Sequence, residues 1–382
     1  MSRLDDMALL GALLRWRHAL IALVGLALLL ASWAGTPPET DWVFFTWGGD
    51  TLLGADRDFV RGTEVISSTG ANGLHLYAEY PFLQIGPPAL LLATGLRLGP
   101  GDGVYLAAAV IQLLGLLTVV LLERSTSRDH RHRLLVLLGG ALLLAVWTGI
   151  AHTRHLDDAL ALSGLAAACA AVVHQRPVLA GALLGFAAAS KPWAVGAIPL
   201  LLAFSTWRTR GSAVGAALGC IALFWLPFVI ADGGTLDLGN VQIPFGRDSA
   251  PAALGAEGLA PQQQLRLVQF IGGMLVAAVV TLLGSWALAP LAAFSVRLLL
   301  EPFPYQYYMA SLAVAALLAD LGCSRLRFPA FTGLVVGAWA ALAAASAQGA
   351  GLIRLGTFAV CLSASVGLAL SGWLTARAET AS

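Results

Sequence analysis

Two aspartates that follow the first hydrophobic segment are candidates for acid–base chemistry. Asp41 opens the stretch DWVFFTWGGD, and Asp50 closes it. Aromatic side chains gather at membrane interfaces, so Asp41 is expected at the boundary between lipid and water. A carboxylate that is partly shielded from water there is a candidate general base. The alternatives are a solvated loop aspartate or an N-cap for a following helix.

A second polar group precedes an apolar segment in the stretch HTRHLDDALALS, residues 152–163. His155 and Asp157 offer a nitrogen and an oxygen ligand in close sequence, so His155, Asp157 and Asp158 could position a metal or an acceptor. The alternative is structural, because acidic residues in the first turn of a helix stabilise its positive end. The spacing alone does not choose between the two.

Lys191 is the only lysine of the chain, and it lies in the nearly unbroken apolar stretch GFAAASKPWAVGAIPLL. An ionisable group at membrane depth indicates a functional site with a partner. A lysine is a compact point charge suited to phosphate. The alternative is that Lys191 extends along the bilayer to reach water.

The stretch SVRLLLEPFPYQYYMASL, residues 295–312, is the fourth polar group. Arg297 and Glu301 are four residues apart and share one helix face, so they could simply form an ion pair within an aromatic belt. The alternative is a wall for a lipid headgroup, in which Arg297 and the hydroxyls of Tyr305, Tyr307 and Tyr308 reach toward phosphate or sugar.

Composition defines the elements that must carry these groups. Of 382 residues, 58% are hydrophobic and 11% are charged, and the mean hydropathy is +0.80. Soluble domains carry about 25% charged residues. The chain is therefore expected to be an all-α polytopic membrane protein, 1–382 forming a single transmembrane domain. The sequence has no basic patch interleaved with aromatic residues, so nothing in it indicates nucleic-acid binding.

The hydrophobic segments predict twelve crossings. Proline ends a helix at the preceding residue, so 178–206 is expected to form two short helices that turn at Lys191. The other expected crossings are 15–34, 104–122, 134–151, 156–174, 211–230, 266–284, 285–300, 304–320, 329–348 and 353–373. The segment 80–98 is apolar but rich in proline, and is expected to lie at the interface or to re-enter from the outer side.

The distribution of arginines orients this topology. With 80–98 outside, 13 of the 22 basic residues face the cytoplasm, as the positive-inside rule favours. They are Arg3, Arg15, Arg17, Arg124, Arg128, Arg131, Arg133, Arg176, Arg208, Arg210, Arg325, Arg327 and Arg377. We therefore expect a multi-pass plasma-membrane protein with both termini cytoplasmic. Two large extracytoplasmic loops, 35–103 with juxtamembrane helices and 231–265, then lie on the side of the polar groups.

In this order, the quoted stretches resemble the GT-C superfamily of membrane glycosyltransferases. The likeness is closest to the actinobacterial polyprenol-phosphate-sugar-dependent enzymes of glycosyltransferase family 87. The matching pieces are DWVFFTWGGDTLLG (41–54), LYAEYPFL (76–83), HLDDALAL (155–162), SKPWAV (190–195) and EPFPYQYY (301–308). Family members often carry Y-P-P where this chain has Y-P-F, which leaves the sugar and the acceptor open.

The resemblance implies an inverting glycosyltransferase of the cell envelope. It implies that Asp41 takes a proton from an acceptor hydroxyl, which attacks the anomeric carbon of a polyprenyl-phosphate sugar. A mannose- or arabinose-like sugar would then move to a glycan or glycolipid acceptor. Lys191 and Arg297, assisted by Tyr305, Tyr307 or Tyr308, would meet the charge that grows on the leaving phosphate.

Other readings stay open at this stage. A transporter or flippase for a lipid-linked substrate would line a path at mid-depth with ionisable residues. A catalytically inactive scaffold is a third possibility. The sequence requires no cofactor and leaves a divalent metal and the oligomeric state open. No Gly-rich phosphate loop, P-loop lysine, G-x-S-x-G elbow or H-E-x-x-H motif occurs.

Overall fold

The computed structural model shows a helical membrane protein. It describes residues 14–35, 41–55, 58–61, 64–67, 73–81, 83–99, 103–126, 130–239, 244–259, 265–322 and 328–381. Within these residues, six helices are long and apolar enough to cross a bilayer, and six shorter apolar helices accompany them. The coarse expectation of a helical membrane protein is therefore confirmed.

The six long helices come from all parts of the chain except its first hundred residues. They are α6 (Val104–Arg124), α7 (His130–Thr153), α8 (Leu156–Val173), α10 (Trp207–Ala231), α11 (Leu265–Leu282) and α15 (Ala347–Ala381). The shorter helices of the bundle are α2 (Arg17–Gly35), α9 (Pro177–Ser190), η3 (Pro192–Ala203), η6 (Trp286–Leu288), α12 (Ala289–Leu299), α13 (Met309–Gly322) and α14 (Ala330–Leu342). Most expected crossings correspond to one of these helices within a few residues.

Two boundaries differ from the expected ones near the end of the chain. The segment 329–348 was expected to be one helix, but α14 ends at Leu342 and α15 begins at Ala347. Ser346 separates them because its hydroxyl accepts a hydrogen bond from Gly349 N at 3.2 Å, which starts the new helix. The expected start at 304 is too early, since α13 begins at Met309.

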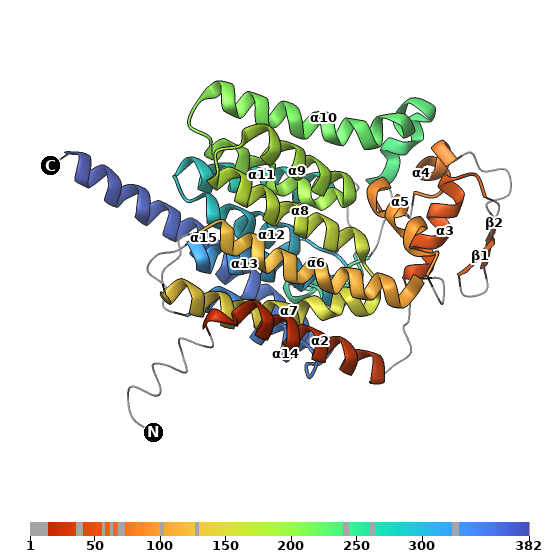
Figure 1. The fold of residues 1–382 in the computed structure, drawn as a ribbon, viewed down its shortest axis with the longest axis horizontal. Helices are drawn as coiled ribbons and strands as arrows, with labels where there is room; N and C mark the ends of the chain where they lie inside the picture. The colour runs from red at the N-terminus through yellow and green to blue at the C-terminus, as the bar shows by residue number, and fades with distance from the viewer. Residues whose placement is uncertain are drawn as a thin grey trace.

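The smaller elements gather at one end of the bundle. They are α3 (Trp42–Leu52), β1 (Asp58–Arg61), β2 (Glu64–Ser67), η1 (Gly73–His75), α4 (Leu76–Glu79), α5 (Pro87–Leu96), η4 (Gly233–Gly239), the π-helix η5 (Ala252–Ala256) and η7 (Gln306–Tyr308). Figure 1 shows α3, α4, α5 and the two strands together at the right, and the start of α2 and the end of α15 at the left. The antiparallel hairpin of β1 and β2 is an exception to the all-α expectation.

The segment 80–98 forms no long helix. Pro87 and Pro88 start α5, which has ten residues and is about 15 Å long, half the thickness of a bilayer core. Before it, the extended segment lies directly on the end of α9, where Gly86 N donates to Ser190 O at 3.1 Å. A Cβ at Gly86 would lie 1.9 Å from Ala189 O, so only glycine fits.

Close contacts at small residues show in which direction the helices around Lys191 run. A Cβ at Gly181 would lie 1.9 Å from Ala213 O, and one at Gly185 would lie 2.4 Å from Ala217 O. Because the positions pair in the same order, α9 and α10 run parallel, packed as small residues four apart allow. The 3₁₀ helix η3 between them must run back, and at about 2.0 Å per residue its twelve residues cover roughly 24 Å.

This alternation brings distant loops to one end of the bundle. Arg154 Nε donates to Val104 O at 3.4 Å, which joins the end of α7 to the start of α6. The start of α8 meets the end of α9 through Asp157 and Lys191. The described arginines expected to face the cytoplasm, such as Arg124, Arg176 and Arg208, flank the opposite helix ends. Arg3, Arg128, Arg325 and Arg327, with the side chain of Arg131, lie outside what the structure describes.

Candidate functional site

The connection between α7 and α8 carries the centre of the polar cluster. Arg154 is fully buried and has a left-handed backbone with φ of 62°. Its guanidinium donates to the carbonyl oxygens of His152 and Val104, which offsets part of the cost of that conformation. The turn sends His155 inward, and α8 begins immediately after it with Asp157 and Asp158 buried in its first turn.

Asp41 bonds to His155 and does not cap α3. Asp41 occupies the N-cap position of α3 but makes no side-chain cap hydrogen bond. Its Oδ2 lies 2.8 Å from His155 Nε2, and its side chain is 47% exposed. The His155 ring also stacks on Tyr307, with centroids 3.8 Å apart and planes at 24°. Burial works to lower the pKa of His155, but the carboxylates of Asp157, Asp41 and Asp158 together raise it above its usual value.

Lys191 is buried and paired, which rules out the alternative that it extends along the bilayer to water. Its Nζ lies 2.5 Å from Asp157 Oδ2 and 3.6 Å from Asp158 Oδ2. Trp193 Nε1 donates to the other oxygen of Asp158 at 2.9 Å. Burial alone would lower the pKa of Lys191, but Asp157 and Asp158 raise it above the ordinary value. The lysine is therefore a fixed positive charge.

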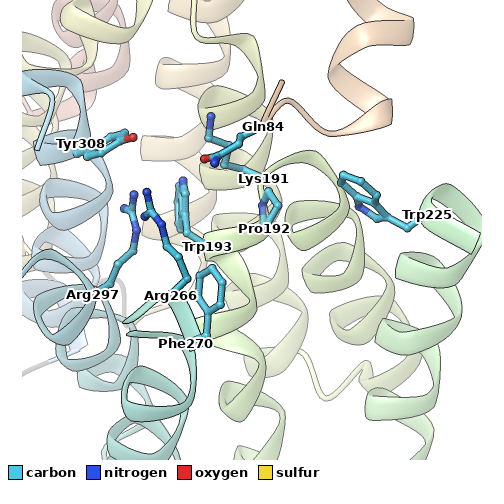
Figure 2. Close-up of a pocket in the computed structure, with 9 residues that line it drawn as sticks. All are labelled: Gln84, Lys191, Pro192, Trp193, Trp225, Arg266, Phe270, Arg297 and Tyr308. Carbon is cyan, nitrogen blue, oxygen red and sulfur yellow. The ribbon is translucent and has the colours of Figure 1, made fainter. Parts of the chain in front are cut away.

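A cavity of about 160 Å³ lies beside Lys191. Its lining comes from η3, α10, α11, α12, η7 and the extended segment before α5. The lining residues are Gln84, Lys191, Pro192, Trp193, Trp225, Arg266, Phe270, Arg297 and Tyr308 (Figure 2). Three cationic side chains and a phenol thus share one small cavity with four apolar or aromatic neighbours, a composition suited to an anionic group attached to a hydrophobic one.

Arg266 and Arg297 stand together on the side of the cavity formed by α11 and α12 (Figure 2). Both contact Glu301, at 3.1 Å from Arg266 Nη1 and 3.5 Å from Arg297 Nη2, so the expected pairing of Arg297 with Glu301 is present. The guanidinium of Arg297 lies over the ring of Tyr308, 4.6 Å from its centroid, and faces Trp193 at 5.3 Å. One carboxylate thus serves two arginines.

Arg154 Nη2, in the turn before His155, has no hydrogen-bond partner. The same is true of three buried polar atoms of the cavity lining and the acidic group, which are His155 Nδ1, Asp158 Oδ2 and Arg297 Nη1. A buried polar atom without a partner costs free energy, and in a native protein it calls for an explanation such as a missing ligand. The Arg297 atom is a spare donor beside the cavity. The other two are possible ligand atoms within the acidic group.

The hydroxyl of Tyr308 remains protonated at physiological pH. Burial, with Glu301 nearby, raises the pKa of Tyr308 to about 12. A neutral phenol can donate a hydrogen bond to an anion without adding negative charge to the cavity. Tyr307 supports it from the side, with ring centroids 4.8 Å apart in an edge-to-face arrangement.

The structure brings most of the sequence candidates into one connected group. The members are Asp41, His155, Asp157, Asp158, Lys191, Arg297, Tyr307 and Tyr308. Asp50 forms an ion pair with Arg97, which joins α3 to α5. Tyr305 lies at the edge, 46% exposed and stacked on Tyr307 at 5.4 Å.

Sequence reasoning missed Arg266 and Gln84. Arg266 is in the first turn of an apolar helix at the same end as Lys191, and that position was the available signal. Gln84 carries no charge and lies between Leu83 and Ile85 in an apolar segment, so nothing in the sequence around it indicated a role in the site.

No family model, curated protein or solved structure matches this chain.

Proposed function

We propose that this protein is an inverting glycosyltransferase that uses a polyprenyl-phosphate sugar as donor. The observation that carries the proposal is the contact path from Asp41 through His155 and Asp157 to Lys191, which lines the cationic cavity. A half-exposed carboxylate and a phosphate-sized site with fixed positive charges are the two parts that such a transfer requires.

In the proposed reaction, Asp41 accepts the proton of an acceptor hydroxyl. The hydroxyl oxygen forms a new bond to the anomeric carbon on the face opposite the phosphate, and the bond from that carbon to the phosphate oxygen breaks. The donor phosphodiester leaves as polyprenyl phosphate, whose charge grows by one. Lys191, Arg266 and Arg297 would meet that charge, and Tyr308 would donate a hydrogen bond to it.

Apolar parts of the same cavity support a lipid-linked donor. Phe270 of α11 and Trp225 of α10 line it together with the cations. The two helices also expose large apolar side chains, including Leu223, Leu226, Leu267 and Ile271, as lipid-facing helices do. A donor phosphate could bind in the cavity while its chain follows these helices into the bilayer.

The arginine distribution supports an extracytoplasmic site. On that assignment both termini are cytoplasmic, the twelve helices cross the plasma membrane, and the acceptor is a glycan or glycolipid of the cell envelope. A mannose- or arabinose-like sugar is proposed from the resemblance to family 87. The transporter reading has less support, because the charged side chains of the described bundle lie near helix ends and not at mid-depth.

Purified protein in proteoliposomes tests the proposal. Polyprenyl-phosphate mannose and polyprenyl-phosphate arabinose are each supplied with a mixture of envelope glycolipids, and release of polyprenyl phosphate is measured. We expect release with one donor and a loss of about 100-fold or more in Asp41→Asn, the range for a general base. Glu257→Gln, an exposed carboxylate in a loop, is the matched control. Wild-type turnover by Asp41→Asn, or acceptor-independent flipping of donor without release, would contradict the proposal.

A further inference from the structure

The acidic group beside the cavity has the arrangement of a metal site. One ligand atom each from His155, Asp157 and Asp158 lies within 4.8 Å of the others, and all three residues are buried. His155 Nδ1 is 3.7 Å from Asp157 Oδ1 and 3.6 Å from Asp158 Oδ2. Bonds of about 2.0–2.2 Å to one ion would put neighbouring ligand atoms roughly 3.0–3.4 Å apart. Small inward shifts would therefore complete the site.

Two of these ligand atoms make no hydrogen bond, although the ammonium of Lys191 lies 3.6 Å from one of them, Asp158 Oδ2. His155 Nδ1 and Asp158 Oδ2 are buried without a hydrogen-bond partner, and the residues are 8% and 3% exposed. They face each other at 3.6 Å, which is too far for a hydrogen bond. Burying these two atoms side by side is costly unless a proton or a cation lies between them, and the ammonium of Lys191 is 3.6 Å from Asp158 Oδ2.

The hydrogen bond to Asp41 prepares the imidazole for a metal. A carboxylate can only accept, so His155 Nε2 is the donor to Asp41 Oδ2 at 2.8 Å. In a neutral ring this leaves Nδ1 with its lone pair directed at the carboxylates. Histidines that ligate a metal usually donate their other nitrogen to a carboxylate in this way.

The charge of the group also favours a dication. Three carboxylates, from Asp41, Asp157 and Asp158, face the single ammonium of Lys191, so a metal ion that displaces the proton of His155 would meet a net charge of −2. The nearby buried cation, Arg154, donates to backbone carbonyl oxygens instead. Lys191 binds Asp157 through Oδ2, while Asp157 Oδ1 accepts from Asp158 N at 2.9 Å and keeps its second lone pair for a cation.

We propose that His155, Asp157 and Asp158 bind one divalent first-row transition-metal ion, with Asp41 as the outer partner of the histidine. An imidazole nitrogen with two carboxylate oxygens suits Mn²⁺ or Zn²⁺, whereas Mg²⁺ and Ca²⁺ prefer all-oxygen sites. The bound ion would hold His155 and thereby fix the orientation of Asp41. This inference does not rest on the proposed transfer reaction, because it follows from the ligand atoms alone.

Metal binding by the full chain in detergent tests the proposal. The protein is stripped with a chelator and titrated with Mn²⁺ or Zn²⁺, and bound ion is measured by elemental analysis and, for Mn²⁺, by electron paramagnetic resonance. We expect one ion per chain, and at least about a 10-fold weaker affinity in Asp158→Asn, which keeps the size of the side chain and its acceptor for Trp193. Glu257→Gln should bind like the wild type.

A second variant separates the site from adventitious binding. Asp41→Asn should weaken the affinity by about 10- to 100-fold without removing a ligand, as the loss of an outer partner does. Thermal unfolding of each chelator-treated variant checks that it is folded. A wild-type chain that binds no ion would overturn the proposal and leave Lys191 as the resident cation. Equal binding by Asp158→Asn would overturn it too, because the ion would then lie elsewhere.

Discussion

Buried carboxylates at the two ends of the bundle differ in how completely they are hydrogen-bonded. At the end with the chain termini, Asp320 of α13 is fully buried and fully bonded. It accepts from Phe331 N at 2.9 Å, Thr332 N at 2.8 Å and Thr332 Oγ1 at 2.7 Å, and so caps α14. At the other end, Asp158 Oδ2 makes no hydrogen bond and lies 3.6 Å from the ammonium of Lys191. Asp320 has the bonding expected of structure, and Asp158 has the bonding expected of a site that awaits a ligand.

The same contrast separates the charged groups. Near the termini, the single carboxylate of Glu123 is shared by Arg17 at 2.5 Å and His18 at 2.5 Å. In the cluster, carboxylates and cations alternate, yet Arg297 Nη1 and His155 Nδ1 remain unpaired. A bilayer raises the cost of unmet polar groups. Arg297 lines the cavity and His155 belongs to the acidic group beside it, so both unpaired atoms are available to a ligand at this end of the bundle.

The largest effect is expected from Lys191→Met. It leaves Asp157 and Asp158 buried without their counter-charge, and breaking a buried pair costs about 3–5 kcal/mol. We expect a large fall in the thermal unfolding temperature in detergent. The double variant Lys191→Met with Asp157→Asn should regain part of the loss. If Lys191→Met were as stable as the wild type, Lys191 would not be the counter-charge that stabilises the buried carboxylates at this end of the bundle.

The next largest effect is expected on donor turnover, from a substitution in the lining of the cavity. Arg297→Gln should lower donor turnover about 100-fold, comparable to removing one preorganised donor for a developing charge, and Arg297→Lys should restore part of it. Arg247→Gln is the control, since Arg247 is 79% exposed and pairs only with a loop carboxylate among the contacts described. Equal losses in both glutamine variants would indicate a general effect of surface charge at this end of the bundle.

Asp320→Ala should lower stability without affecting turnover, the reverse of Arg297→Gln. It removes the cap of α14 and is expected to cost about 2 kcal/mol of stability while turnover per folded molecule stays unchanged. Thermal unfolding together with turnover normalised to folded protein measures both. Loss of turnover at wild-type stability would mean that Asp320 belongs to a functional site.

The smallest effect is a pH dependence at the surface of the cluster end. Bonds from Gly234 N, and then from His75 at 3.1 Å, lower the pKa of Asp232 below its ordinary value of 3.8. Its contribution to stability is therefore full above that value and is lost as the pH falls through the lowered pKa. Unfolding temperatures of wild type and Asp232→Asn should thus differ near neutral pH and converge well below pH 3.8. A difference that stays constant over this range would contradict the assignment.

Helices that are long and apolar could be predicted from the sequence, because the bilayer imposes length and hydropathy on each segment separately. The break at Lys191 could be predicted as well, since Pro192 forbids a continuous helix. The hairpin of β1 and β2 was not expected. Only juxtamembrane helices were expected in the loop 35–103, although E-V-I-S (64–67) carries the branched residues typical of a strand.

Which residues contact each other within the site could not be predicted without the tertiary structure. Lys191 and Asp157 meet because α8 and α9 run antiparallel, and the sequence does not state which residues of the two ends are in register. Asp50 and Asp41 look alike in sequence, but α5 brings Arg97 to the former and α7 brings His155 to the latter. Arg266 joins the site only because α11 packs beside η3.

The most direct measurement is a cryo-electron-microscopy map of the full chain in lipid nanodiscs with polyprenyl phosphate added. We expect phosphate density in contact with Lys191, Arg266 and Arg297, with the lipid chain leaving past Phe270 toward α11. Phosphate density at another place, with this cavity unchanged from the lipid-free map, would contradict the central claim.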